Sequence, residues 1–201
     1  ACGEKLTGER WFPEPAAPGA MLARVIPDGP DETHDTLRQV IVGALSVARE
    51  RVRVMTPYFL PDVTVQDALK TAALRGVAVD VILPLRNNLR LVDWACRGQL
   101  EGLLRWGVRV WFSPGDFDHS KLFTVDAQWC MVGSANWDPR SLRLNFECNL
   151  ECHDAPLTRG LEAMMDRCRA GARELTLAEL RSVGFAVRLR NGVARLLSPY
   201  L

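Results

Sequence analysis

Apolar runs of strand length alternate with helical patterns along the first half of the chain. The strand-like runs cover residues 22–26, 52–56, 77–83 and 108–112. The helical patterns, in which apolar residues recur every three or four positions, cover residues 35–51, 63–74 and 91–106. This alternation predicts an α/β domain with a mixed, largely parallel sheet and helices packed on both of its faces.

After Pro114 the pattern becomes that of antiparallel strands. Two short runs, 121–125 and 129–132, flank a tight turn and predict a hairpin. The run 145–152 then alternates strictly between polar and apolar residues. Its apolar face, which we expect in the core, carries Phe146, Cys148, Leu150 and Cys152.

The C-terminal third reads as helical. Asp154 is a candidate N-cap, with Pro156 inside the first turn of a helix that runs to about residue 173, and a second helix begins near Leu177. Residues 181–201 hold four arginines and no acidic residue, and their apolar residues recur at helical spacing. This stripe fits packing against the domain, which we take as the expectation, or lying on an anionic membrane surface.

Residues 1–20 are rich in proline and glycine, which predicts a linker or tail before a domain over 21–201. The chain starts at Ala1 instead of a methionine, so it could be a piece of a longer protein. The longest uncharged apolar stretch, 39–48, is shorter than the roughly 20 residues that a membrane-spanning helix needs.

The composition excludes a strong electrostatic field over the whole molecule. The 25 basic and 24 acidic residues leave a net charge of +1, so any anion site has to be local. The six cysteines are scattered through a chain that is long enough to fold without covalent cross-links. We therefore expect free thiols in a reducing compartment.

Reactive side chains are densest between residues 119 and 147. If the hairpin turn were the two-residue loop Ala127–Gln128, Lys121 would lie opposite Ser134 and His119 opposite Asn136. All four side chains would then leave one face of one hairpin, whereas a one-residue slip would send the two pairs to opposite faces.

An imidazole beside an ammonium, a hydroxyl and a carboxamide suits an oxyanion of phosphorus, which indicates phosphoryl or phosphatidyl transfer. Gly133 would give the substrate close access to the backbone. Glu147 would accept the Nδ1 proton of His119 and so fix its tautomer. Asp126 lies at the turn, where we expect its carboxylate to hold the hairpin backbone.

The spacing of these residues resembles the H-x-K-x4-D-x6-G-S-x-N signature of the phospholipase D superfamily. The runs GSANWDPRSLRLNFE (133–147), TPYF (56–59) and RLVD (90–93) are similar to bacterial cardiolipin synthases, over roughly residues 23–161. The resemblance implies transfer through a phosphohistidine from phosphatidylglycerol or a related phospholipid to a second lipid hydroxyl. It implies no metal or other cofactor, because Lys and Asn side chains neutralise the phosphate.

Members of this family carry two H-x-K motifs, and this chain has one, because His34 and His153 have no lysine two residues later. Either the chain is the C-terminal half of a longer enzyme, or two copies pair about a two-fold axis. We expect the first, with His119 as general acid and little activity in the isolated chain. The expected partners are a phospholipid, the second half-site and the anionic cytoplasmic face of the cell membrane, where the chain would be peripheral.

Several alternatives remain open. A homodimeric phosphodiesterase, endonuclease or phospholipase D of the same superfamily is disfavoured by the low net charge and by the run DPRSLRLNFE. A noncatalytic module is disfavoured by the intact motif. Zinc at Cys148, Cys152 and His153 is disfavoured because His153 falls on the other face of the strand. Tyr58 and Phe59, which follow a strand, could wall a lipid pocket or belong to the core.

Overall fold

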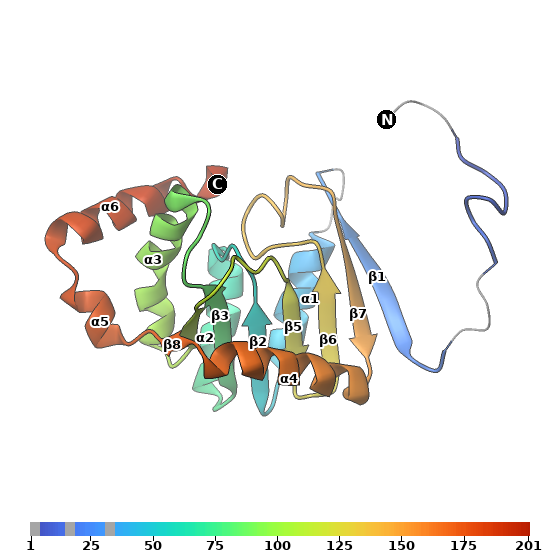
Figure 1. The fold of residues 1–201 in the computed structure, drawn as a ribbon, viewed down its shortest axis with the longest axis horizontal. Coiled ribbons are helices and arrows are strands. Elements are labelled where there is room, and N and C mark those ends of the chain that lie inside the picture. The colour runs from blue at the N-terminus through green and yellow to red at the C-terminus, as the bar shows by residue number, and fades with distance from the viewer. Residues whose placement is uncertain (1–4, 15–18, 31–34) are drawn as a thin grey trace.

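The computed structural model describes residues 5–14, 19–30 and 35–201, and in these ranges the strands form a single mixed sheet (Figure 1). The strand order is β1-β7-β6-β5-β2-β3-β4-β8. The strands are β1 (Leu22–Asp28), β2 (Arg51–Met55), β3 (Ala78–Pro84), β4 (Arg109–Ser113), β5 (Leu122–Val125), β6 (Trp129–Gly133), β7 (Glu147–His153) and β8 (Arg173–Glu174).

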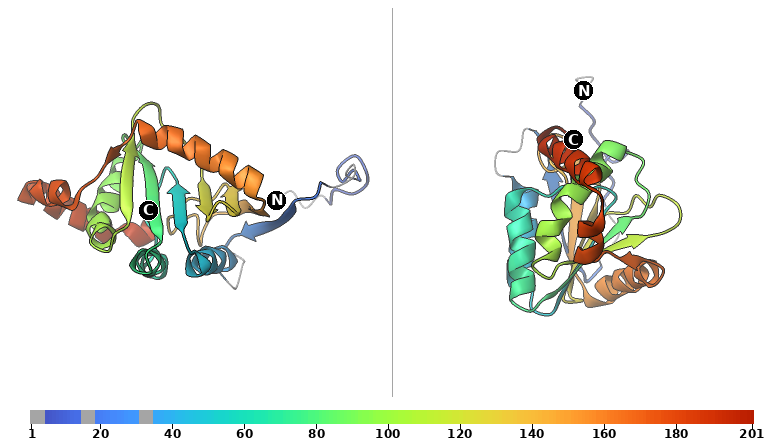
Figure 2. Two further views of the ribbon diagram at one scale, coloured as in Figure 1. Left: turned by 90° about the horizontal axis from the view of Figure 1, so that it is seen from below. Right: turned by 90° about the vertical axis from the view of Figure 1, so that its left-hand side faces the viewer.

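Helices cover both faces of the sheet, which confirms the predicted α/β architecture (Figure 2). One face carries α1 (Thr36–Val47), α2 (Val63–Leu74) and α3 (Arg90–Leu104), and the other carries α4 (Ala155–Ala170). Beyond β8, the short α5 (Leu177–Ser182) leads into α6 (Phe185–Leu196), which lies along α3, and into a 3-10 turn over Ser198–Tyr200. No helix in the described ranges is long and apolar enough to span a membrane.

Parallel pairing is confined to β2, β3 and β4, which is less of the sheet than we expected. The other neighbours are antiparallel. Parallel strands need a crossover of a dozen or more residues, which α2 and α3 supply. From β5 to β7 the chain returns through loops that contain no helix, so each strand reverses direction.

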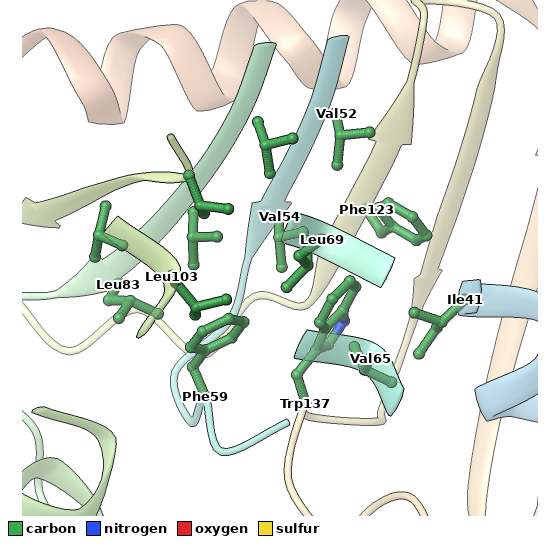
Figure 3. Close-up of a cluster of buried hydrophobic side chains, with 14 of the residues drawn as sticks. Ile41, Val52, Val54, Phe59, Val65, Leu69, Leu83, Leu103, Phe123 and Trp137 are labelled. Carbon is green, nitrogen blue, oxygen red and sulfur yellow. The ribbon is translucent and has the colours of Figure 1, made fainter. Parts of the chain in front are cut away.

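The core lies between the sheet and the first three helices. Apolar residues from α1 and α2, including Ile41, Val65 and Leu69, meet Phe123 and Trp137 from the sheet side (Figure 3). The predicted N-cap is present: the Asp154 carboxylate accepts a hydrogen bond from the Leu157 N–H at 2.7 Å. Residues 5–14 form no helix or strand, while 1–4 and 15–18 of the predicted tail lie outside the described residues.

The predicted burial of β7 is wrong. Its polar residues Asn149 and Glu151 point inward and are buried, whereas Cys148 and Leu150 are exposed, and Phe146 just before the strand is 75% exposed. The reason is that α4 packs over β3 to β6 and does not extend over β7. Cys152 is buried as expected, and the five cysteines of the described ranges are free thiols.

Candidate active site

Four strand ends meet at one end of the sheet, and the reactive residues lie there. β5 is antiparallel to both β2 and β6, and β6 is antiparallel to β7. The residues just before β5, just after β2 and β6, and at the start of β7 therefore lie at the same end of the sheet, which we call the site rim (Figure 1). These positions hold His119 and Lys121, Tyr58, Ser134 and Asn136, and Glu147.

The hairpin register differs by one residue from the predicted one. Val125 pairs with Trp129, and Leu122 pairs with Val132, so three residues separate the strands. Asp126 and Ala127 occupy the left-handed region at φ 52° and 53°. Continued, this register would place Lys121 opposite Gly133, so the predicted Lys121–Ser134 pair is wrong.

The site residues gather for another reason. The β5–β6 ladder ends at Leu122 and Val132, and the chain after β6 turns to β7 instead: the Ser134 N–H donates to the Cys148 carbonyl at 3.1 Å. The site is thus built by strand ends that converge on one rim, and a one-residue slip does not disperse it.

His119 and Lys121 contact each other directly. The Lys121 ammonium lies 2.9 Å from His119 Nδ1 and donates to the His119 carbonyl at 2.6 Å. The pKa of His119 is lowered, first by partial burial and then by the charge of Lys121, while Asp118 opposes the shift. Because Nδ1 accepts from an ammonium, the neutral ring carries its hydrogen on Nε2.

Glu147 bonds a different partner from the predicted one. Its carboxylate accepts a hydrogen bond from the Ser134 hydroxyl and another from the Asn145 amide at 3.3 Å. Nδ1 of His119, which we expected Glu147 to engage, faces Lys121. Burial lowers the pKa of Lys121, and the nearby charge of Glu147 is the largest of the effects that raise it. Glu147 therefore acts on the site through Ser134 and through its field at Lys121.

Asn136 is held by two residues that the sequence analysis did not single out. Its amide donates to the Ser141 hydroxyl at 3.1 Å, and the Ser141 N–H donates to the Asp138 carboxylate at 2.8 Å. All three residues are buried, and burial raises the pKa of Asp138. The signal for this loop was the Asp138-Pro139 pair, which is typical of a turn.

Gly133 serves packing between strands. A β-carbon at this position would lie 2.6 Å from the Cys148 carbonyl oxygen of β7, which is closer than real contacts allow. The close approach of β7 thus accounts for the glycine, and its expected role in giving the substrate access to the backbone stays a prediction.

Asp126 lies at the opposite end of the sheet from His119. Its carboxylate accepts from the N–H groups of Arg49, Glu50 and Arg51, each at 2.8 to 2.9 Å. Asp126 therefore has a structural role, as we expected, but the backbone it holds is the entry to β2 and not its own hairpin.

Tyr58 and Phe59 have different surroundings. Tyr58 meets His119 edge-on at 5.9 Å between ring centroids, and its hydroxyl donates to Asn88 at 2.8 Å. It lines a cavity of about 510 Å³ together with Asn136. Phe59 is buried and stacks on Trp137, so it belongs to the core and not to a lipid pocket.

Metal ligands do not cluster in the described part of the chain: no group of three or more His, Cys, Asp or Glu side chains there could hold a metal ion. Cys148 is exposed near the start of β7, whereas Cys152 is buried farther along the strand.

Comparison of the sequence with known proteins finds cardiolipin synthases among its relatives. The family model "Cardiolipin synthase, PLD-like domain" matches residues 41–169. Cardiolipin synthase 2 of Staphylococcus epidermidis is 33% identical over 199 residues, which are 98% of this chain and 41% of that protein. The major cardiolipin synthase of Bacillus subtilis is 32% identical over 190 residues, 94% of this chain and 39% of that protein. The chain thus spans about two fifths of the length of these relatives.

Solved structures share the fold. A phosphatidylserine synthase of Haemophilus influenzae superposes with a TM-score of 0.70 at 20% identity, over 90% of this chain and 48% of that one. The phospholipase D family member Nuc of Salmonella typhimurium superposes with a TM-score of 0.67 at 18% identity, over 78% of this chain and 99% of that one.

Proposed function

Because this chain belongs to the cardiolipin synthase family with a phospholipase D-like domain, we propose that it supplies one half of a phosphatidyl-transfer site. The observation that carries the proposal is the rim on which His119 and Lys121 lie in contact beside Ser134 and Asn136. A phosphodiester oxyanion bound there would be neutralised by the Lys121 ammonium and by the polar groups of Ser134 and Asn136.

We assign His119 the role of general acid. The histidine of the second half attacks phosphorus, a P–N bond forms, the P–O bond to glycerol breaks, and His119 gives its proton to the departing oxygen. In the second step, His119 takes the proton of a second phosphatidylglycerol hydroxyl, whose oxygen displaces the phosphohistidine. The products are cardiolipin and glycerol, and both histidines return to their starting states. A lowered pKa makes the protonated His119 a stronger acid for the first step.

The partners follow from this chemistry. The second imidazole comes from another half-site, either in the same longer protein or in a second copy of the chain. The lipid substrate places the site at a membrane surface, with the domain bound peripherally. The free thiols of the described residues fit the reducing, cytoplasmic side of that membrane.

A chimera tests the proposal. The matched segment of the Staphylococcus epidermidis relative would be replaced by this chain, and cardiolipin formation would be measured on phosphatidylglycerol vesicles. His119→Ala should lower the rate by about 10²- to 10⁴-fold, the usual contribution of general acid–base catalysis. His153→Ala is the matched control, because this exposed imidazole lies at the far end of β7.

Three results would contradict the proposal: an unaffected His119→Ala chimera, release of phosphatidic acid in place of cardiolipin, or DNA cleavage by the chain alone. The first removes His119 from catalysis. The second assigns hydrolysis, and the third assigns a homodimeric nuclease. If the second half-site lies in the same longer protein, the isolated chain should show little or no turnover of phosphatidylglycerol, whereas cardiolipin formation by the chain alone would assign the second imidazole to a second copy.

A further inference from the structure

Helix α6 turns its large apolar side chains toward solvent. Phe185, Leu189, Val193 and Leu196 recur at three- and four-residue intervals and so share one helix face. They are 78%, 56%, 54% and 77% exposed, respectively. We call these four residues the α6 stripe. The expectation that the apolar residues of this segment pack against the domain is wrong for all four.

The opposite face of α6 fixes the helix on α3. Asn191 and Ala194 are buried, and the Asn191 carbonyl lies so close to Gly98 that a β-carbon there would be 2.5 Å from it. The Arg190 guanidinium lies over the Trp94 ring at 4.4 Å from its centroid. These contacts with α3 therefore set the orientation of α6. In this orientation the α6 stripe faces solvent.

The charge along α6 itself has one sign, and Glu101 of α3 lines a small hollow together with Arg188. Residues 180–201 contain no Asp or Glu, whereas Arg188 and Arg195 follow one flank of the stripe. Within residues 5–14, 19–30 and 35–201, neither guanidinium forms a hydrogen bond or an ion pair. An exposed apolar stripe flanked by unpaired arginines matches the interface of an anionic bilayer, in which apolar side chains enter the acyl region and arginines meet lipid phosphates.

The end of α6 lies beside the candidate site. Arg195 and Leu196 line a cavity of about 540 Å³ that also holds Leu60 and Leu142. Leu60 in turn lines the cavity of about 510 Å³ that contains Asn136, with Tyr200 and Leu201 on its wall. A bilayer under α6 would therefore lie next to the hollow that leads to the motif residues.

From this arrangement we infer that the α6 stripe, with Arg188 and Arg195, seats the chain in the plane of an anionic membrane. The inference deepens the proposed function, because it names the surface through which the lipid-transfer site meets its substrate. Vesicle binding needs no turnover, so it is tested separately from the chemistry. His119→Ala should bind vesicles like the unsubstituted chain even where transfer is lost.

The test is co-sedimentation with vesicles of equal parts phosphatidylcholine and phosphatidylglycerol, compared with vesicles of phosphatidylcholine alone. Arg188→Gln with Arg195→Gln should weaken binding to the anionic vesicles about thirtyfold, because each arginine near such a surface strengthens binding about fivefold. Leu189→Glu with Val193→Glu should weaken it about a hundredfold, because apolar contact is lost and repulsion is added.

Matched controls carry the same changes elsewhere. Val47→Glu with Leu74→Glu alters two apolar residues at the ends of α1 and α2 that are at least as exposed as Leu189 and Val193. Arg49→Gln with Arg159→Gln alters two exposed arginines. Both controls should bind like the unsubstituted chain. Circular dichroism melting checks that every variant folds.

The inference is overturned if both stripe variants sediment like the unsubstituted chain, or if neutral vesicles bind as well as anionic ones. It is also overturned if light scattering shows a dimer that Leu189→Glu with Val193→Glu dissociates while vesicle binding persists, because the stripe would then be a protein interface.

Discussion

At the scale of single residues, the contact between Lys121 and His119 helps to lower the pKa of His119. Replacing Lys121 by Met removes a positive charge 2.9 Å from Nδ1, which favours the imidazolium, so the pKa of His119 should rise toward its ordinary value. Partial burial, the larger cause of the lowered pKa, remains in the variant. The rise should therefore be incomplete.

An NMR titration of the His119 ring measures this change. Lys70→Met is the control, because Lys70 pairs with Asp67 on α2, in a different part of the fold. An unchanged or lower pKa in Lys121→Met would show that the ammonium does not act on the imidazole.

At the scale of elements, the approach of β6 to β7 depends on Gly133. Gly133→Ala should lower the free energy of unfolding by about 1–3 kcal/mol, the usual cost of overpacking, since the new methyl meets the β7 backbone. Gly160→Ala in α4 has open space around it and should raise stability by about 0.5–1 kcal/mol. Urea unfolding followed by tryptophan fluorescence compares the two. Equal stabilities would mean that β7 can move away without cost.

The elements also show what local patterns can and cannot predict. The bounds of α2 agree with the prediction of 63–74, because Asp62 caps the helix locally. The predicted helix 35–51 ends early, at Val47, because the backbone from Arg49 to Arg51 is held by Asp126. That partner is 77 residues away from Arg49 in sequence, so no local window reveals it. The inverted face of β7 likewise depends on the path of α4, which begins just after β7 and runs away from it over the other strands.

For the site, the motif spacing predicted which residues gather, but the hairpin register behind that prediction was wrong. The residues still gather despite this one-residue error in register, because the convergence of strand ends depends on the strand directions and not on which residues pair. Asp138 and Ser141 were missed because their role is to hold Asn136, and such a role depends on a loop conformation that the sequence pattern does not specify.

At the scale of the whole molecule, α5 and α6 are joined to the rest mainly through α3. Hydrogen exchange should therefore be faster in α6 than in β2 and β3, which lie at the centre of the sheet. Gly98→Ala should raise exchange in α6 alone, because its methyl would meet the Asn191 carbonyl. Gly102→Ala, on the same helix but with open space, is the control. Equal exchange in the two variants would show that α6 is not held at Gly98.

The division between the two ends of the sheet has a consequence for how such a domain can change over generations. One rim carries His119, Lys121, Ser134 and Asn136, and the opposite rim carries Asp126 and the turns at Gly76 and Gly107. Drift, insertion and fusion at the second rim are limited by folding alone. Under the proposed function, the first rim is held by its chemistry as well, so lineages could lengthen their loops on one side while the reaction on the other stays the same.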